Sequence, residues 1–394
     1  MIKRFSVKNF RSLLNVSVDL APVTVLVGRS GTGKTNFVQA IELLRTIIES
    51  GANVGPLNQA LMRFGSPNGF RPANIKGAGF NTEFQITFDV PGYKGDFVYK
   101  LEIEFNRSPN NNIRVSSESM HFRDQALYSQ ADGKWAIEPK LANAGMSGGA
   151  APGNVLLGQL TGLPEVNVAY ISLVQSIRSY SFPGNVLADN SSPGPVRVEV
   201  LNETGSNAMR VVDGIVGSIK ALPDWREIEM SLKTLSASLI GITVNPSGNP
   251  AVGGGLGASF RLGDTVVSVD IAQQSEGFRR FLAHLLAIYQ NVTQQVIIFE
   301  EPEKGIFPGA LSLLADHIKS ANEKLGTQFI LTTHSPQLLD AFPGDSIRWV
   351  RFSDHGTQIS PLPPDEIIAI REGLMSPSEL LTVADSGEPK PARE

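Results

Sequence analysis

The sequence contains no cysteine and no long uninterrupted apolar run. The absence of cysteine excludes disulfides, thiolate metal sites and cysteine nucleophiles together. No stretch approaches the roughly 18 to 20 apolar residues that a membrane-spanning helix needs, and the opening MIKRFSVKNF lacks the apolar core of a signal peptide. We therefore expect a cytoplasmic protein without a membrane partner.

An excess of positive charge is also missing. The 34 Lys and Arg residues are outnumbered by 38 Asp and Glu residues, so the net charge is −4 and no global basic field indicates nucleic-acid binding. A local basic face is compatible with this balance, which leaves DNA among the partners that the composition allows. A hydrophobic content of 41% over 394 residues suffices for a large α/β domain with insertions or for two modest domains.

The most informative stretch lies near the N-terminus. Val23–Val27 has the β-branched and apolar pattern of a buried strand. Residues 28–35 read GRSGTGKT, which matches G-x-x-x-x-G-K-[ST] at every specified position. Apolar residues then recur at helical spacing: Phe37, Ile41, Leu44 and Ile48. Strand, glycine loop and helix form the context of a phosphate-binding loop, because backbone N–H groups and a helix N-terminus hold phosphate oxygens together.

Two side chains of this loop have predicted roles. Lys34 is expected to reach the β- and γ-phosphates of a nucleotide, and the Thr35 hydroxyl is expected to ligate Mg²⁺. The residues assigned to the nucleotide are Gly28, Ser30, Gly31, Thr32, Gly33, Lys34, Thr35 and Asn36. A glycine-rich turn that matches by chance is the alternative, and the flanking strand and helix argue against it.

Two carboxylates close a second apolar strand. Residues 296–299 are apolar, and Glu300 and Glu301 follow them at the carboxyl end of the strand, where ligands bind in open α/β sheets. Glu300 is predicted to hold Mg²⁺ through water, and Glu301 to polarise the attacking water. The structural alternative is a strand that ends in two solvated acids.

Two further motifs have both a functional and a structural interpretation. His334 closes an apolar strand in the run TTHSP, where it could hydrogen-bond the γ-phosphate or the attacking water; a lone histidine there is otherwise structural. Ser275 opens an amphipathic helix and has the pattern of an N-cap. The exposed N–H groups of such a helix start could equally bind an anion.

Taken together and in this order, the motifs resemble those of ABC-type ATPases of the SMC/RecF/OLD group. More narrowly, they resemble the stand-alone AAA-family ATPases of bacterial defence operons. The motifs are 28–35, 275–277, 300–303 and 333–336, preceded by Asn9-Phe10-Arg11-Ser12-Leu13, which matches the start of that group. Residues 201–207 resemble a segment that such proteins carry in the middle, and the similarity covers residues 1–120 and 260–350 best.

This resemblance implies a homo-oligomer in which two subunits, or more, sandwich ATP and Mg²⁺ head to tail. Ser275 and Gly277 would then face the γ-phosphate bound by the other subunit, and Arg11 is a candidate phosphate contact with a structural salt bridge as the alternative. The glutamine that usually joins the lid to Mg²⁺ has two candidates, Gln159 and Gln175.

The sequence also departs from its relatives. The signature Ser-Glu-Gly-Phe lacks the second glycine and the glutamine of transporter ATPases, and relatives commonly carry Ser-Asp-Gly-Thr. Phe307 stands where many relatives have histidine. These departures bear on turnover more than on binding. The residues after the His334 motif are Pro-rich without an acidic cluster, so we expect no nuclease of the OLD type in the chain.

The predicted fold is α/β: a P-loop NTPase with an ABC-ATPase-like mixed sheet, an antiparallel N-terminal β subdomain and an inserted, partly helical lid or arm. Strands are expected over 2–8, 14–20, 80–90, 97–105 and 113–122, with 51–80 on the surface. Helices are expected over 207–221, 225–240, 278–289 and 309–324. The expected domains are 1–123 and 263–375 for the two halves of the ATPase, 124–262 for the insertion and 376–394 for a tail.

Three functions are compatible with these residues. The first is an ATPase that assembles on ATP and regulates a separate effector, such as a nuclease or toxin in anti-phage defence. The same ATPase could instead act in DNA repair as a RecF-like DNA-binding protein. The second is an ATP-dependent assembly scaffold with negligible turnover. The third, the ATPase half of a transporter, is disfavoured by the signature and by the 124–262 insertion.

Overall fold

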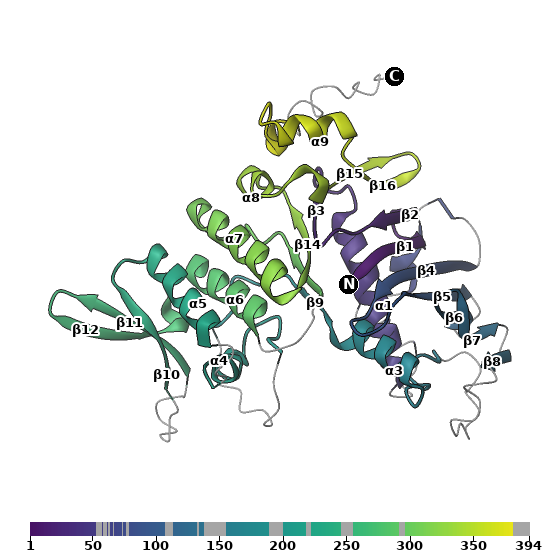
Figure 1. Ribbon diagram of the computed structural model, residues 1–394, viewed down its shortest axis with the longest axis horizontal. Helices are drawn as coiled ribbons and strands as arrows, with labels where there is room; N and C mark the ends of the chain where they lie inside the picture. Colours follow the sequence, from purple (N-terminus) through teal and green to yellow (C-terminus); the bar gives the residue numbers. More distant parts are fainter. Residues whose placement is uncertain are drawn as a thin grey trace. The chain divides into compact units, whose positions relative to one another are not determined.

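The computed structural model describes residues 1–52, 57, 61, 64–65, 67–72, 74–75, 79–106, 113–131, 134–137, 155–188, 200–217, 222–245, 255–290 and 296–380. The chain forms two compact units, which alternate along the sequence (Figure 1). The first comprises Met1–Ser179 and Gly344–Ile368, and the second comprises Tyr180–Pro343 and Ala369–Glu394. The four-part division expected from the sequence stays a prediction. Within the described residues, no helix is long and apolar enough to cross a membrane.

A seven-stranded antiparallel sheet dominates the first unit, in the order β2-β1-β4-β5-β6-β7-β8. Its strands are β1 (Ile2–Phe10), β2 (Leu13–Asp19), β4 (Gly79–Asp89), β5 (Asp96–Asn106), β6 (Ile113–Phe122), β7 (Gln125–Ala131) and β8 (Lys134–Ile137). All five strands predicted for this region are confirmed. The Pro91-Gly92 pair also predicts a turn, which is confirmed, with Gly92 at φ 86°. The turn that the sequence predicts at 108–112 lies wholly outside the described residues.

The sheet continues past the five predicted strands into β7 and β8, which the expected domain division places in the insertion 124–262. Arg123 and Asp124, which join β6 to β7, both have positive φ angles of 50° and 63°. Turns of this kind usually carry Asn, Asp or Gly at both positions, so an arginine at the first position hides the turn. β7 and β8 therefore extend the antiparallel sheet.

The buried face of this sheet packs against α1 (Lys34–Ala52). Phe5 of β1 and Phe37 of α1 meet edge to face, with 5.5 Å between the ring centroids. The predicted helical stripe is confirmed, because all four of its apolar residues are buried. The prediction that residues 51–80 lie on the surface is wrong at Phe70. This side chain is buried, and its ring stacks on that of Phe10 with 5.8 Å between the centroids. An aromatic ring gains enough from burial to draw a Gly- and Pro-rich segment onto the core.

Three more strands of the first unit position the glycine loop. β3 (Val23–Val27) is buried along its whole length, as predicted. It pairs in parallel with β15 (Ile347–Ser353), which pairs antiparallel with β16 (Gly356–Pro361). In this register Trp349 lies opposite Val27. The start of β16 therefore lies close to the loop that follows β3.

A buried carboxylate fixes the chain where it returns to the sheet. Glu118 of β6 accepts hydrogen bonds from Tyr99 at 3.0 Å, Tyr128 at 2.8 Å and Gln130 at 2.7 Å. It also accepts the backbone N–H groups of residues 156 and 157 at 2.7 and 2.9 Å. These bonds anchor the segment that continues into α3 (Pro164–Tyr170), the π-helical turn η2 (Ile171–Gln175) and β9 (Ile177–Tyr180).

The second unit is built around a parallel strand pair and a buried helix. β13 (Val296–Glu300) and β14 (Gln328–Thr333) pair in parallel, with Glu300 opposite Thr332. The associated helices are α6 (Glu276–Tyr289), α7 (Pro308–Leu325) and α8 (Pro336–Asp340). Every residue of α6 from Phe281 to Tyr289 is buried. The strands predicted near 296 and 329 and the helices predicted over 278–289 and 309–324 are confirmed.

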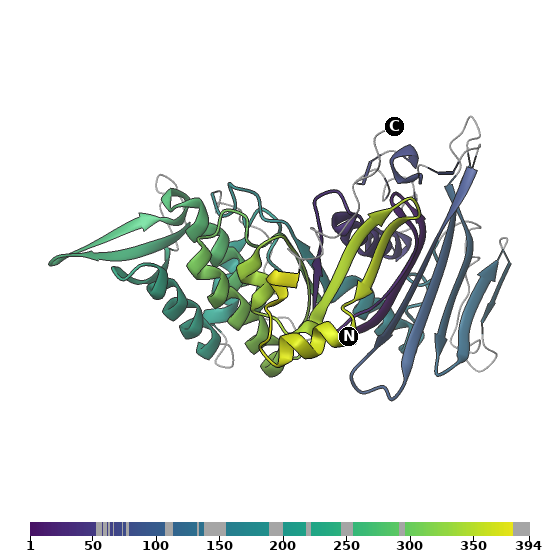
Figure 2. The ribbon, with the colours of Figure 1, turned by 90° about the horizontal axis from the view of Figure 1, so that it is seen from above.

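The remainder of the second unit combines α4 (Ala208–Val216) and α5 (Leu222–Leu235) with a three-stranded antiparallel sheet. Its strands are β10 (Leu239–Asn245), β11 (Gly255–Leu262) and β12 (Thr265–Asp270), and the β11–β12 hairpin extends beyond α5 (Figures 1 and 2). The helix predicted over 225–240 is wrong at its end, because Gly241 and the β-branched residues around it favour an extended chain. Residues 218–221 of the other predicted helix lie outside the described residues.

Short elements complete the described chain: η1 (Pro67–Phe70), η3 (Ile271–Gln273), η4 (Gly344–Ser346) and α9 (Pro364–Arg371). The predicted tail lies outside the described residues from 381 onward.

Candidate functional site

The glycine loop between β3 and α1 has a backbone that only glycine accommodates. Gly31 and Gly33 have φ angles of 80° and 104°, a region that disfavours any side chain. A Cβ at Gly33 would also lie 2.8 Å from the Ser12 hydroxyl oxygen and would meet the Thr357 side chain. Gly28 packs directly against the Val350 carbonyl group. The glycines of the motif are therefore required by the fold of the first unit.

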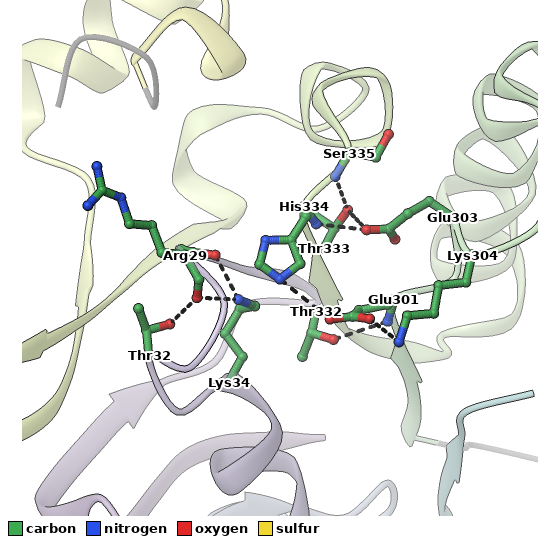
Figure 3. Close-up of polar contacts among 11 residues, drawn as sticks. Arg29, Thr32, Lys34, Glu301, Glu303, Lys304, Thr332, Thr333, His334 and Ser335 are labelled. Atoms are coloured by element: carbon green, nitrogen blue, oxygen red, sulfur yellow. Dashed lines mark hydrogen bonds and ion pairs between the residues drawn. The ribbon is translucent and has the colours of Figure 1, made fainter. Parts of the chain in front are cut away.

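Lys34 lies inside the loop that it follows. Its Nζ donates to the carbonyl oxygens of Gly28 at 2.7 Å and Arg29 at 2.9 Å (Figure 3). Thr32 closes the same turn, since its hydroxyl donates to the Arg29 carbonyl at 2.9 Å. The Lys34 side chain is buried, whereas Ser30, Gly31 and Thr35 are exposed. A buried ammonium beneath exposed N–H and hydroxyl groups is the arrangement that receives a phosphate chain.

A set of side-chain hydrogen bonds that the sequence does not reveal supports this loop. The Thr357 hydroxyl of β16 donates to the Thr32 carbonyl at 2.7 Å, although 325 residues separate the two in the sequence. The same hydroxyl lies 2.7 Å from the Ser12 hydroxyl. The Asn36 amide donates to Ser12 at 2.7 Å. Asn36 thus has a role within the protein, and its predicted contact with nucleotide stays a prediction.

Arg11 lies in the tight turn between β1 and β2, with φ 51°. Its guanidinium donates to Gln39, to Asn36 at 3.4 Å and to the Phe64 carbonyl at 3.1 Å, and it also lies over two aromatic rings, those of Phe10 and Phe70. Every one of these partners is neutral, and burial lowers the pKa of the guanidinium. The geometry explains Arg11 as a tie between the turn and α1, and a phosphate contact stays a prediction.

The acidic strand end of the second unit holds Glu301 in an unusual conformation. Glu301 has φ 46°, which costs a non-glycine residue about 1–2 kcal/mol. Two bonds from its N–H offset that cost, to the Thr332 carbonyl at 3.0 Å and the Thr332 hydroxyl at 3.1 Å. The carboxylate forms an ion pair with Lys304 and lies 3.4 Å from Nε2 of His334 (Figure 3). The structure thus brings together Glu301 and His334, as the sequence predicts for a shared site.

The predicted signature residues open α6, as expected. Ser275 is the N-cap, and its hydroxyl accepts the Phe278 N–H at 3.3 Å. The requirement for glycine at position 277 has a structural explanation. A Cβ there would lie 2.8 Å from the Gly305 carbonyl oxygen in the loop after β13. The signature therefore packs directly against the acidic loop of its own unit. Anion binding by Ser275 and Gly277 stays a prediction.

The metal ligands and the lid glutamine stay predictions. Thr35 belongs to the first unit and Glu300 to the second. Among the described residues, no group of three or more His, Asp or Glu side chains could hold a metal ion. A hydroxyl and a carboxylate nevertheless suit Mg²⁺, which keeps several waters and shares phosphate oxygens. Gln175 is exposed in η2, and the Gln159 amide donates to the Val155 carbonyl at 3.2 Å.

Two family models match separate parts of the chain. Residues 1–134 match "AAA ATPase domain", and residues 261–340 match "AAA domain, putative AbiEii toxin, Type IV TA system". The two matches contain the phosphate loop and the three later motifs respectively.

Curated relatives share short stretches. An OLD nuclease of Thermus scotoductus is 34% identical over 97 residues, which is 25% of this chain and 16% of that protein. The DNA replication and repair protein RecF of Rhodococcus erythropolis is 29% identical over 114 residues, covering 29% of this chain and 25% of RecF. RecF of Arthrobacter sp. is 36% identical over 125 residues, 31% of this chain and 26% of that protein. The chain thus spans about a quarter or less of these relatives.

Solved structures extend the likeness to the whole fold. An SMC head bound to the C-winged helix domain of ScpA superposes with a TM-score of 0.56 at 14% identity, covering 93% of this chain and 99% of the head. An SMC head with an extended coiled coil, bound to the C-terminal domain of ScpA from Pyrococcus furiosus, gives a TM-score of 0.50 at 13% identity, covering 95% and 99%. The fold is that of a P-loop, ABC-like ATPase, and together the findings support an SMC/RecF/OLD-like ATPase.

Proposed function

We propose that the protein binds ATP with Mg²⁺ and hydrolyses it. The observation that carries the proposal is the pairing of Glu301 with His334 at the end of the acidic strand, in a chain whose glycine loop already holds Lys34 in place. Mg²⁺, when bound, neutralises negative charge on the β- and γ-phosphates. Thr35 and Glu300 have the oxygen ligands to hold it.

In this proposal the side chains act as follows. Lys34 places its charge against the phosphates, and Glu301 takes the proton of the attacking water. His334, 3.4 Å from Glu301, orients that water or the γ-phosphate by a hydrogen bond. The exposed Ser275 at the start of α6 contacts the nucleotide of a second copy, so that ATP joins two subunits.

We further propose that ATP-driven assembly regulates a separate effector, such as a nuclease or toxin. The match to an AbiEii-related model and the similarity to an OLD nuclease support this class of role. Direct DNA binding, suggested by the RecF relatives, is less favoured on the described sheet of the first unit. There, four basic side chains are paired with acids at 2.5–2.7 Å: Lys3 with Asp96, Arg4 with Asp19, Lys8 with Glu83 and Arg114 with Glu104.

Steady-state hydrolysis by the wild type and by Glu301→Gln tests the proposal. Removing the proton acceptor is expected to lower kcat by about 100- to 1,000-fold, while ATP binding measured by calorimetry persists. Glu323→Gln, the same chemical change at an exposed site on α7, is the matched control and should leave kcat unchanged. Equal, negligible turnover in all three proteins would instead favour the assembly scaffold.

Mass in solution tests the assembly. Glu301→Gln is expected to double its mass when Mg-ATP is added, and a second change, Ser275→Arg, is expected to prevent the doubling without preventing ATP binding. An assembly that is large without ATP and indifferent to it would contradict the sandwich and support the scaffold.

A further inference from the structure

Glu303 joins the loop after β13 to the loop after β14 through one carboxylate oxygen. Its Oε1 accepts the Thr333 hydroxyl at 2.9 Å and the backbone N–H of His334 at 2.7 Å (Figure 3). The Thr333 hydroxyl oxygen in turn accepts the N–H of Ser335 at 2.9 Å. Three consecutive residues are therefore held, directly or through Thr333, by one side chain from the other loop.

The same two loops meet at further points that place His334 beside Glu301. The Glu301 N–H donates to the Thr332 carbonyl at 3.0 Å, and Nε2 of His334 lies 3.4 Å from Oε1 of Glu301. An imidazole reaches a fixed partner only if its own backbone is fixed. Thr332 anchors the strand end, and Glu303 anchors the residue that carries the imidazole.

The second carboxylate oxygen of Glu303 argues against a purely structural role. Oε2 is buried and, among the residues that the structure describes, has no hydrogen-bond partner. A buried polar atom without a partner costs on the order of 1–3 kcal/mol, so stability alone does not favour a glutamate here. Both donors converge on Oε1, and a neutral carbonyl oxygen at the same place would accept them equally well.

We propose that Glu303 is a positioning residue for ATP hydrolysis, which fixes the backbone of His334 so that its imidazole stays beside Glu301. The proposal rests on the proposed function, because it concerns the same reaction. In this role Glu303 touches neither nucleotide nor water and acts through His334. What it must supply is an acceptor oxygen at the Oε1 position, and its charge is not required.

Kinetics of Glu303→Ala and Glu303→Gln separate position from charge. Glu303→Ala is expected to lower kcat at least tenfold, toward the value of His334→Ala, with KM changed less than about threefold. Glu303→Gln, which keeps an acceptor oxygen, is expected to retain kcat within about threefold. The double variant Glu303→Ala/His334→Ala should be no slower than His334→Ala alone, because residues that act through one another are not additive.

Two results would overturn the proposal. A loss in Glu303→Gln as large as that in Glu301→Gln would assign Glu303 to the chemistry, and wild-type turnover in folded Glu303→Ala would remove it from the mechanism. If Glu303→Ala does not fold, Thr333→Val removes one donor and keeps the carboxylate, with Thr333→Ser as its control. Thr333→Val is then expected to lower kcat about three- to tenfold and Thr333→Ser to restore it; equal turnover in both would contradict the proposal.

A readout independent of turnover keeps this inference separate from the proposed function. The chain has 5 histidines, so carbon-labelled histidine gives a sparse NMR spectrum in which His334→Asn identifies the His334 signal. Glu303→Ala is expected to shift that signal and Glu303→Gln to leave it in place. A wild type without ATPase activity but with this pattern would refute the proposed function alone, whereas an unmoved signal in Glu303→Ala would refute the positioning role alone.

Discussion

The phosphate loop of the first unit and the acidic loop of the second unit are built by different means. The phosphate loop owes its shape to glycines, with Gly31 and Gly33 at φ 80° and 104°. The acidic loop contains a left-handed glutamate, Glu301 at φ 46°, held by hydrogen bonds to Thr332. A loop built from backbone freedom is visible as a motif, whereas a loop built from side-chain bonds depends on partners that the fold supplies.

The largest effect is expected for a substitution at Gly33, where the phosphate loop has no space for a Cβ atom. Gly33→Ala adds a Cβ within 2.8 Å of the Ser12 hydroxyl at a φ of 104°, so it combines backbone strain with a clash. We expect ATP affinity to fall at least about a hundredfold, since the loop must open to accommodate the methyl group.

Gly31→Ala is the matched control, because its φ of 80° is also left-handed but its Cβ would meet nothing within 4 Å. Backbone strain alone costs about 1–2 kcal/mol, so its affinity should fall less than about thirtyfold. Nucleotide titration of both variants makes the comparison. Equal losses of ATP affinity in the two variants would show that the backbone conformation, and not the space around the Cβ, determines which residues the loop accepts.

A second effect distinguishes the units by their response to acid. His284, in the core of the second unit, lies between Phe182 and Phe299, and its burial lowers its pKa to about 4. Between pH 6.5 and 4 the unfolded chain takes up a proton at this site and the folded chain does not, so stability falls as pH falls. The expected loss is about 2 kcal/mol at pH 5.

Urea unfolding at pH 7 and pH 5 checks this loss. His284→Leu should reduce the pH dependence relative to the wild type. In the first unit, burial raises the pKa of Glu118, so its contribution to stability depends on pH in the opposite direction. That contribution is complete below pH 4.5 and is lost as pH rises through the raised pKa. An unchanged slope in His284→Leu would contradict the assignment.

The smallest effect concerns the ion pair beside the acidic loop. Lys304, an exposed residue, neutralises part of the charge on Glu301, and exposed pairs of this kind contribute up to about 1 kcal/mol. Removing the cation leaves Glu301 a better proton acceptor. Lys304→Gln is therefore expected to raise kcat by up to about fivefold, measured against Lys319→Gln, which removes the cation of the ion pair with Asp316 on α7. A fall in kcat would show that Lys304 assists the reaction.

Much of the fold follows from local patterns. The strands β1 to β6 and the helices α1, α6 and α7 were predicted from apolar spacing, which survives folding because one face of each element is buried. The turn at Arg123 and Asp124 was missed, since its positive φ angles occur without glycine. The burial of Phe70 was missed because its partners Phe10 and Phe105 are distant in sequence.

The candidate site shows the same division. The sequence alone determined the phosphate loop and the acidic and histidine motifs, because glycine freedom, a lysine and two carboxylates at strand ends define their chemistry locally. Only the tertiary structure decided that Thr357 supports Thr32, that Arg11 bonds α1 and that Glu303 holds the backbone of His334. Each of these is a hydrogen bond between residues that chain folding alone brings within about 3 Å.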